Sequence, residues 1–473
     1  MGKTQLLQEI DSFIEENEND ILSDMAELVS KRSVRGPAED GAPFGPGPRS
    51  ALDAGLAIAK RLGLLVNDGD GYVGWADIPG KGKEYIGVIA HLDVVPEGDG
   101  WNSDPYVLTE RDGWLIGRGI SDNKGAAVVS LYAAAFLARA GKPLNYGIRV
   151  MMGCDEECGM HDVTYYLSRN PEPIFCFTPD VDFPVSIGEK GIHSGGVFVS
   201  APVFTTISSF SAGIATNAIP GRASCVLSAP GMSGKKFKET EGIAVLPRDD
   251  GSFLIEARGI GGHAAHPDGK VNAIGILTDF LLDNEIGGAD ERLFLELLRK
   301  IHSNAYGEGL GIACTGESLG RLTSIGGVIS QEGGVLRQDM NIRYPECVTG
   351  GDITKALSKI AAEHNARFEE GEITEPFYIS PDFPAIKVLL SAYREISGHA
   401  AEPYTMFGGT YARHFKNAVG FGPGDDFTPR PSFVASDHAP NEASYFPSLK
   451  EALKIFILAL WRLQELSPEE LGR

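Results

Sequence analysis

"YGIRVMMGCDEECG", residues 146–159, is an apolar run that ends abruptly at acidic residues. The run fits a buried β-strand, and residues 159–169 fit a short helix after it. Glu156 and Glu157 would therefore stand just beyond the carboxyl end of a strand. They are either chemically active carboxylates or solvated loop charges. Cys154 and Cys158 beside them could form a thiolate metal pair or a disulfide.

Two further apolar runs, EYIGVIA and IFCFT, end at polar residues in the same way. His91 and Asp93 follow the first run, Asp180 follows the second, and Asp122 precedes a long helical segment. This alternation of strands and helices predicts an α/β domain with a largely parallel sheet. Because ligands bind beyond the carboxyl ends of such strands, we expect these residues to converge with the glutamate pair.

The character of the chain changes near residue 190. Glycine-rich, β-like segments continue to about residue 376, with helices expected at 272–283 and 290–302. A helical pattern then returns and the chain closes with an amphipathic helix. The sequence therefore predicts a discontinuous catalytic domain, residues 1–190 and 377–473, with an inserted α+β lid domain at 191–376.

The expected cluster is rich in metal-binding groups. Imidazole and carboxylate ligands suit Zn²⁺, Mn²⁺ or Co²⁺. Five carboxylates, counting Asp93, exceed what one tetrahedral zinc ion needs, so two ions that share a bridging carboxylate fit better. Each element alone also has a purely structural interpretation, since adjacent glutamates are usually solvated. Their joint placement at strand ends is what favours a metal site.

The net charge and the apolar content of the sequence argue against several classes of partner and location. The formal net charge of −22 argues against nucleic acid or an anionic membrane as the main partner. The first residues lack the apolar core of a secretory signal, and no run approaches the ~20 apolar residues of a membrane span. Six unevenly spaced cysteines are typical of reduced thiols rather than a disulfide scaffold. We therefore expect a cytoplasmic protein.

The ordered motifs resemble those of a known family. HLDVVPEGDGW, GRGISDNKGA, GCDEECG and FTPDVDFPVSIGEKG are similar to the metal motifs of the M20 metallopeptidases, most of all to the long, monomeric PepV-type dipeptidases. ATNAIPGRA, GHAAHPDGKVNA, NIRYP, FGGTYARHFKNAVGFGP and DHAPNEA match later motifs, so the resemblance spans nearly the whole chain. It implies a zinc-peptidase-like catalytic domain, interrupted by a lid, that holds two divalent metal ions.

The resemblance also implies a ligand set. His91 and Asp180 would bind the first metal, Asp122 would bridge both ions, and Glu157 and His438 would bind the second. Zn²⁺ is the first choice for these ions, with Mn²⁺ or Co²⁺ as alternatives. Members of the family have a cis peptide after the bridging aspartate, so the Asp122–Asn123 bond is expected to be cis.

Catalytic roles follow from the same motifs. Glu156 would be the general base that takes a proton from water held between the ions and passes it to the leaving amine. Asp93 would orient the imidazole of His91. His263 from the lid would stabilise the oxyanion, and Asn217 would help to hold the substrate carbonyl.

Substrate contacts are expected at two further motifs. Arg343 is suited to a bidentate grip on the C-terminal carboxylate of the substrate, although it could instead pair with an acidic neighbour. Backbone amides of Gly408, Gly409 and Thr410 could share that carboxylate.

Two histidines of the lid segment are candidates for the residue that stabilises the oxyanion. His266 competes with His263, but the family places the histidine four residues before a proline, and Pro267 therefore selects His263. The usual Pro-x-x-Gly-x-Asn-Ala pattern is PDGKVNA here, with Lys270 where glycine normally stands. The backbone of the turn before Asn272 must therefore adopt a different conformation, which affects the direction in which the His263 side chain points.

The lid is longer than in dimeric members of the family, which implies a monomer with a closed site for dipeptides. Alternatives are an M20 carboxypeptidase, an N-acyl-amino-acid amidohydrolase and, in another class, a non-catalytic metal-dependent binding protein. The presence of both Glu156 and His263 argues against the last of these. Because the implied ligand set is complete without sulfur, Cys154 and Cys158 are expected to be packing residues.

Overall fold

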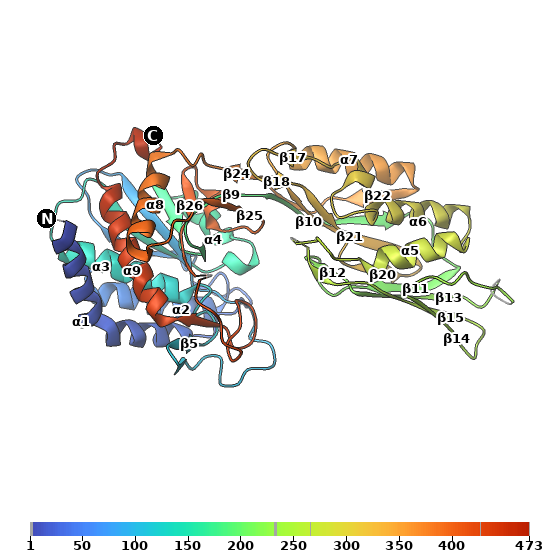
Figure 1. Cartoon of the computed structure of the whole chain (residues 1–473), viewed down its shortest axis with the longest axis horizontal. Helices are drawn as coiled ribbons and strands as arrows, with labels where there is room; N and C mark the ends of the chain where they lie inside the picture. The colour runs from blue at the N-terminus through green and yellow to red at the C-terminus, as the bar shows by residue number, and fades with distance from the viewer. Residues whose placement is uncertain (1–2, 231–233, 265, 426, 473) are drawn as a thin grey trace. The chain divides into compact units, whose positions relative to one another are not determined.

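The computed structural model describes residues 3–230, 234–264, 266–425 and 427–472. The chain forms two compact units (Figure 1). Unit 1 comprises Met1–Ile187, Ile379–Tyr404 and Gly409–Arg473, and unit 2 comprises Gly188–Tyr378 and Thr405–Gly408. The segment 405–408 thus groups with unit 2, although its place in the sequence suggested the catalytic domain.

Unit 1 is built on a mixed sheet whose central strands are parallel. Its strands lie in the order β1 (Leu65–Gly69), β2 (Val73–Ile78), β6 (Gly147–Gly153), β3 (Tyr85–His91), β7 (Phe175–Thr178), β26 (Ala418–Gly420) and β9 (Ser186–Glu189). β3 runs parallel to both β6 and β7, and β26 runs parallel to β7. Every residue of β3 is buried, as its continuous apolar run requires.

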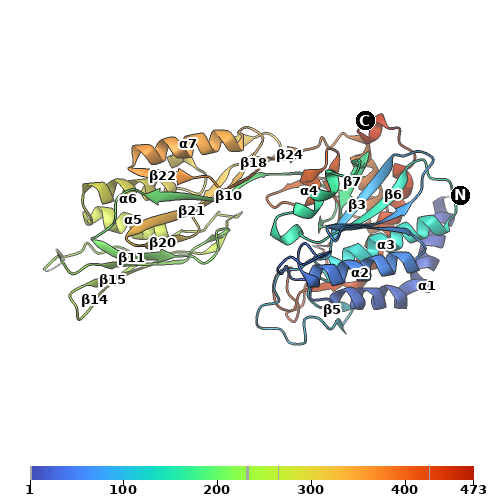
Figure 2. The same cartoon turned by 180° about the vertical axis from the view of Figure 1, so that it is seen from behind.

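Helices cover this sheet and complete one core (Figure 2). They are α1 (Lys3–Val29), α2 (Pro46–Arg61), α3 (Lys124–Arg139), α4 (His161–Leu167), α8 (Pro384–Ser397) and α9 (Phe446–Leu463), with short 3₁₀ turns η1 (Glu156–Cys158), η3 (Tyr411–His414) and η4 (Glu469–Leu471). α3 packs against β3 and β6 and is itself covered by α1 and α9. The predicted α/β class is confirmed.

The apolar segment before the Asp122 loop forms a strand that lies away from the main sheet. It is β5 (Trp114–Ile116), which pairs with β4 (Thr109–Arg111) and β28 (Ala443–Tyr445) in a small separate sheet. β8 (Val181–Asp182) and β27 (Pro423–Gly424) form another pair. The loop that carries Asp122 therefore runs from this small sheet into α3.

Unit 2 has its own sheet and its own core. The strands lie in the order β14 (Ile243–Pro247), β15 (Phe253–Arg258), β13 (Arg222–Leu227), β11 (Ile207–Ala212), β20 (Ile329–Glu332), β21 (Val335–Tyr344), β10 (Gly191–Ser200) and β22 (Ala366–Glu369). β19 (Thr323–Ile325) and β23 (Glu372–Thr374) pair beside β21 and β10. Shorter strands are β12 (Ala218–Ile219), β16 (Gly262–His263), β17 (Thr315–Gly316) and β18 (Gly320–Arg321), whereas β24 (Phe377–Tyr378) and β25 (Tyr404–Met406) pair with β9.

Helices α5 (Ala273–Asp283), α6 (Ala289–Ile301) and α7 (Gly350–Glu363) lie on one face of the unit 2 sheet, and η2 (Glu308–Leu310) is a 3₁₀ turn (Figures 1 and 2). α5 and α6 agree with the two predicted helices. α7 was not predicted, although Thr349 caps it by accepting the Asp352 N–H at 3.2 Å. Among the described residues, no helix is both long and apolar enough to span a membrane.

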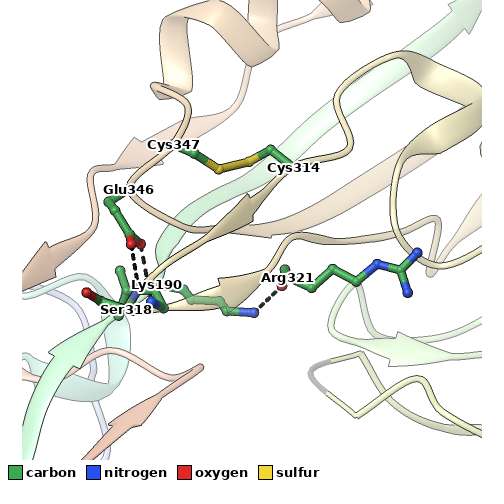
Figure 3. The surroundings of a disulfide bond; sticks show 7 residues. Lys190, Cys314, Ser318, Arg321, Glu346 and Cys347 are labelled. Carbon is green, nitrogen blue, oxygen red and sulfur yellow. Dashed lines mark hydrogen bonds between the residues drawn. A yellow bond between two sulfur atoms is a disulfide. The ribbon is translucent and has the colours of Figure 1, made fainter.

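The expectation that all six cysteines are free thiols is wrong. Cys314 and Cys347 form a disulfide in unit 2, with Cα atoms 6.6 Å apart (Figure 3). Glu346 beside it accepts the N–H groups of Ser318 at 2.7 Å and Leu319 at 3.2 Å. The two bonded cysteines are 33 residues apart, with Cys314 just before β17 and Cys347 after β21, so their spacing alone did not reveal the pair.

We predict that the denatured, unreduced protein titrates four thiols with Ellman's reagent and that a reductant raises the count to six. A loop of 33 residues gives the disulfide about 4 kcal/mol of stabilisation in the chain-entropy model, so Cys314→Ser should lower the free energy of unfolding of unit 2 by up to that amount. A reductant should then leave the stability of the Cys314→Ser variant unchanged. Six thiols before reduction would contradict the prediction.

Candidate metal centre and active site

The expected metal ligands of unit 1 meet at the carboxyl edge of its parallel strands. His91 is the last residue of β3, and Asp180 stands two residues beyond β7. Glu157 lies in η1, directly after β6, whose last residue Gly153 pairs with His91. Parallel register places these strand ends side by side, so residues distant in sequence share one location.

Asp122 lies at the centre of this group. Its Oδ1 is 2.7 Å from His91 Nε2, and its Oδ2 is 2.9 Å from His438 Nε2. Asp180 Oδ1 is 3.6 Å from the same nitrogen of His91, and Glu157 Oε2 is 3.1 Å from that of His438. One aspartate therefore joins two ligand groups, each with one imidazole and one further carboxylate. A pair of cations bridged by a carboxylate requires this arrangement.

The side chains also fit a metal in their chemistry. Glu157 Oε1 is buried and has no hydrogen-bond partner among the described residues, which is costly for a carboxylate unless a cation binds it. Ligand atoms of His91, Asp122 and Glu157 lie within 4.8 Å of one another, and so do those of His91, Glu156 and Asp180. Glu156 is thus close enough to His91 and Asp180 to exchange a proton with a molecule bound between them.

The electrostatics of the cluster reflect an excess of negative charge. Burial raises the pKa of Glu156 well above its usual range, and the charge of Asp180 raises it further. Burial likewise raises the pKa of Asp180 to about 6. Hydrogen bonds to Asp122 and Glu157 raise the pKa of His438 to about 11. Divalent cations would neutralise this charge and leave the imidazoles neutral, as ligands must be.

Asp93 contacts both His91 and the loop that carries Glu156 and Glu157. The Nδ1 of His91 donates to the backbone carbonyl of Asp93 at 3.0 Å, which leaves the Nε2 lone pair for a cation. The Asp93 carboxylate is 3.5 Å from His91 Nδ1. It instead accepts the N–H groups of Glu156 at 3.2 Å and Glu157 at 3.1 Å. Asp93 therefore positions the glutamate loop as well as His91, which the sequence did not suggest.

A buried ion pair that sequence reasoning missed fixes the loop of Asp122. Glu442 accepts N–H groups from Gly119, Ser121 and Asp122 at 3.0–3.1 Å and is 2.6 Å from the guanidinium of Arg118. Both side chains of the pair are 1% exposed. Glu442 stands four residues after His438, so this pair joins the segments that carry two of the expected ligands. The glutamate within DHAPNEA was the available signal.

The bond between Asp122 and Asn123 is cis, which confirms the expectation drawn from the motif. The Asn123 amide donates to the Pro179 carbonyl at 2.7 Å, so the loop of Asp122 is also tied to the segment before Asp180. His438 has a φ of 63°, a left-handed conformation that few non-glycine residues adopt and that is concentrated at functional sites.

Unit 2 places two of the expected lid residues next to each other. His263 of β16 pairs with Ala218 of β12, and the Ala264 N–H donates to the Asn217 carbonyl at 2.9 Å. Both His263 and Asn217 are exposed. Partial burial lowers the pKa of His263, and the positive charge of Arg343 lowers it further. The imidazole is therefore neutral near pH 7 and can donate one N–H.

The other expected substrate contacts lie on β21 and after β25. Arg343 donates to Asn341 Oδ1 and to the Phe407 carbonyl, each at 3.2 Å. Gly408 closes the short segment that belongs to unit 2, whereas Gly409 and Thr410 belong to unit 1. Thr410 is buried and caps η3 by accepting the Ala412 N–H at 3.2 Å.

A mixed sheet whose parallel central strands end at imidazoles and carboxylates around a shared aspartate suits a metal-dependent hydrolase. The family described as "Peptidase family M20/M25/M40" matches residues 87–462. The chain belongs to this peptidase family, and the expected M20 membership is confirmed.

Sequence relatives agree with this assignment. A Bacillus subtilis (strain 168) protein named "Putative dipeptidase YtjP" is 30% identical over 460 residues, which covers 94% of this chain and 97% of the relative. A Staphylococcus saprophyticus dipeptidase of the same description is 31% identical over 477 residues, which covers 95% and 98%. Among solved structures, the aminoacylhistidine dipeptidase from Vibrio alginolyticus has the same fold, with a TM-score of 0.56, 14% identity, and coverage of 93% and 96%.

We predict that Glu442→Gln weakens metal binding by about tenfold or more, because second-layer groups of this kind orient the ligands. It should also lower the free energy of unfolding by about 3 kcal/mol, since it leaves Arg118 buried without its counter-ion. Metal affinity is measured by competition with a chromophoric chelator.

Glu395→Gln is the matched control, because Glu395 of α8 also pairs with an arginine. Its partner is Arg462 of α9, at 2.7 Å. The metal affinity of Glu395→Gln should equal that of the wild type. Equal weakening in both variants would contradict a specific role for Glu442.

Proposed function

We propose that this peptidase hydrolyses unblocked dipeptides at a centre that holds two divalent metal ions. The observation that carries the proposal is the placement of Asp122, with one carboxylate oxygen toward His91 and the other toward His438. The names of the relatives in Bacillus and Staphylococcus support the substrate class. In the proposed ligand set, His91 and Asp180 hold one ion, Glu157 and His438 hold the other, and Asp122 bridges them.

When bound, the two cations would polarise the substrate carbonyl and acidify a water molecule. The oxygen of that water would attack the carbonyl carbon while its proton passes to Glu156, whose carboxylate lies within 4.8 Å of ligand atoms of His91 and Asp180. Glu156 then delivers the proton to the nitrogen of the leaving amine. Its backbone N–H is held by Asp93, so the carboxylate starts from a fixed loop.

The proposed roles of the remaining residues concern the substrate itself. Neutral His263 donates an N–H to the carbonyl oxygen as negative charge develops there, with Asn217 beside it. Arg343 and the backbone amides of Gly408, Gly409 and Thr410 bind the C-terminal carboxylate.

Zn²⁺ is the metal we propose first, because imidazole and carboxylate ligands in groups of three suit it, with Mn²⁺ or Co²⁺ as alternatives. We also propose a monomer, on the strength of the long second unit. The proposed compartment is the cytoplasm. The Cys314–Cys347 disulfide is an observation against it, because disulfides are rare in cytosolic proteins.

A substrate panel tests the reaction. Protein stripped with a chelator should be inactive, and Zn²⁺, Mn²⁺ or Co²⁺ restored in turn should recover the cleavage of unblocked dipeptides, followed by ninhydrin or chromatography. Cleavage of N-acetylated amino acids alone would identify an acyl amidohydrolase. Stepwise removal of C-terminal residues from longer peptides would identify a carboxypeptidase. Either result would replace the dipeptidase proposal.

Glu156→Gln tests the base. The amide cannot take a proton from water, so kcat should fall about 10²- to 10⁴-fold while two metal ions per chain remain by atomic emission. Cys158→Ala is the control, because Cys158 lies in the same turn η1 and is exposed. It should retain both activity and metal. Full activity in Glu156→Gln would refute the proposed role.

A further inference from the structure

Tyr411 is buried and donates its hydroxyl to a buried carboxylate that the proposed chemistry does not use. It is the first residue of η3 and directly follows Thr410. Its Oη donates to Oδ2 of Asp162, which lies in the first turn of α4, 249 residues earlier in the chain. Both side chains are inaccessible to solvent. A hydrogen bond between such distant segments is a tertiary link rather than a local cap.

The same oxygen of Asp162 also holds the backbone that leads to Glu156. It accepts the N–H of Cys154 at 2.6 Å and the N–H of Asp155 at 3.0 Å. The other oxygen accepts the N–H of Val163 at 2.7 Å. Three donors from two segments thus meet at one buried oxygen, and the tyrosine hydroxyl is the only side chain among them.

Gly153 shows how closely the hydroxyl approaches this backbone. A Cβ at Gly153 would lie 1.9 Å from Tyr411 Oη and 2.6 Å from Asp162 Oδ2, so no side chain fits there. Gly153 ends β6 and pairs with His91 of β3. The hydroxyl therefore packs directly against the strand end from which the glutamate loop begins.

Asp93 supports the next part of the same loop. It accepts the N–H groups of Glu156 and Glu157, whereas Asp162 accepts those of Cys154 and Asp155. Four consecutive amides are therefore bound by two buried carboxylates. A loop held at each residue keeps one position for its side chains, and a general base loses efficiency when displaced by about 1 Å.

We propose that Tyr411 is a positioning residue that couples the turn of Gly409 and Thr410 to the loop of Glu156 through Asp162. The inference rests on the proposed function, which assigns the substrate carboxylate to that turn and the base to that loop. Because the hydroxyl and the turn are adjacent in the chain, one buried hydrogen bond fixes the turn that binds the substrate carboxylate relative to the base. Tyr411 itself contacts neither substrate nor metal in this proposal.

Tyr411→Phe removes the hydroxyl and retains the ring. The holoenzyme should lose about tenfold or more in kcat, with KM changed less than about threefold because Arg343 still binds the carboxylate. Two metal ions per chain should remain. Asp162→Asn should give a similar loss, and the double variant should lose little more than either single one, because both substitutions break the same link.

Tyr132→Phe is the matched control. Tyr132 is also buried in unit 1 and donates its hydroxyl to an aspartate, Asp24, at 2.7 Å, but this pair joins α3 to α1. It should shift the melting temperature to a similar extent as Tyr411→Phe and leave kcat unchanged. A wild-type kcat in Tyr411→Phe, or an equal loss of kcat in Tyr132→Phe, would overturn the proposal.

Hydrogen exchange separates this proposal from the proposed function. Peptides covering 153–158 and 408–414 should exchange faster in Tyr411→Phe than in the wild type, and should be unchanged in Tyr132→Phe. Unchanged exchange in Tyr411→Phe would overturn the link even if activity falls. If the wild type cleaves no dipeptide, the dipeptidase proposal fails, and the exchange data alone decide whether Tyr411 holds the loop.

Discussion

The confinement of negative charge around Asp122 is the constraint on which the rest of unit 1 depends. Four carboxylates, those of Asp122, Glu156, Glu157 and Asp180, approach two imidazoles at one strand edge. Like charges about 4 Å apart repel by about 4 kcal/mol at an effective dielectric constant of 20. The folded chain can hold such a cluster only if cations neutralise it and if the loops that carry it cannot move apart.

A second group of buried carboxylates supplies that restraint. Asp93, Asp162 and Glu442 each accept at least two backbone N–H groups from the loops that carry the proposed ligands or base. Each thus fixes the backbone of a loop and leaves the functional side chain unengaged. Acidic residues therefore serve two purposes here: one set faces the centre, and the other holds the peptide groups behind it.

The sequence indicated that the residues of the first set converge, but it did not indicate the contacts of the second set. The ends of β3, β6 and β7 follow from apolar runs, so the convergence of His91, Asp180 and the glutamates could be inferred from local pattern and strand topology. Glu442 and Asp162 act through contacts with segments hundreds of residues away, and no local pattern encodes the partner. The Cys314–Cys347 disulfide was missed for the same reason, since 33 residues of sequence separate its two cysteines.

The two cysteines around the glutamate pair illustrate how burial selects between chemical alternatives. Cys154 is fully buried, and burial raises the pKa of its thiol well above the usual range, so it stays a neutral thiol. Cys158 is exposed and is not bonded to it. A thiolate ligand requires the opposite environment, a lowered pKa beside positive charge. Asp155 between them is bound by Arg35 and His161. The loop between β6 and α4 is therefore a carboxylate motif in which the buried Cys154 contributes packing, whereas Cys158, expected to pack as well, is exposed.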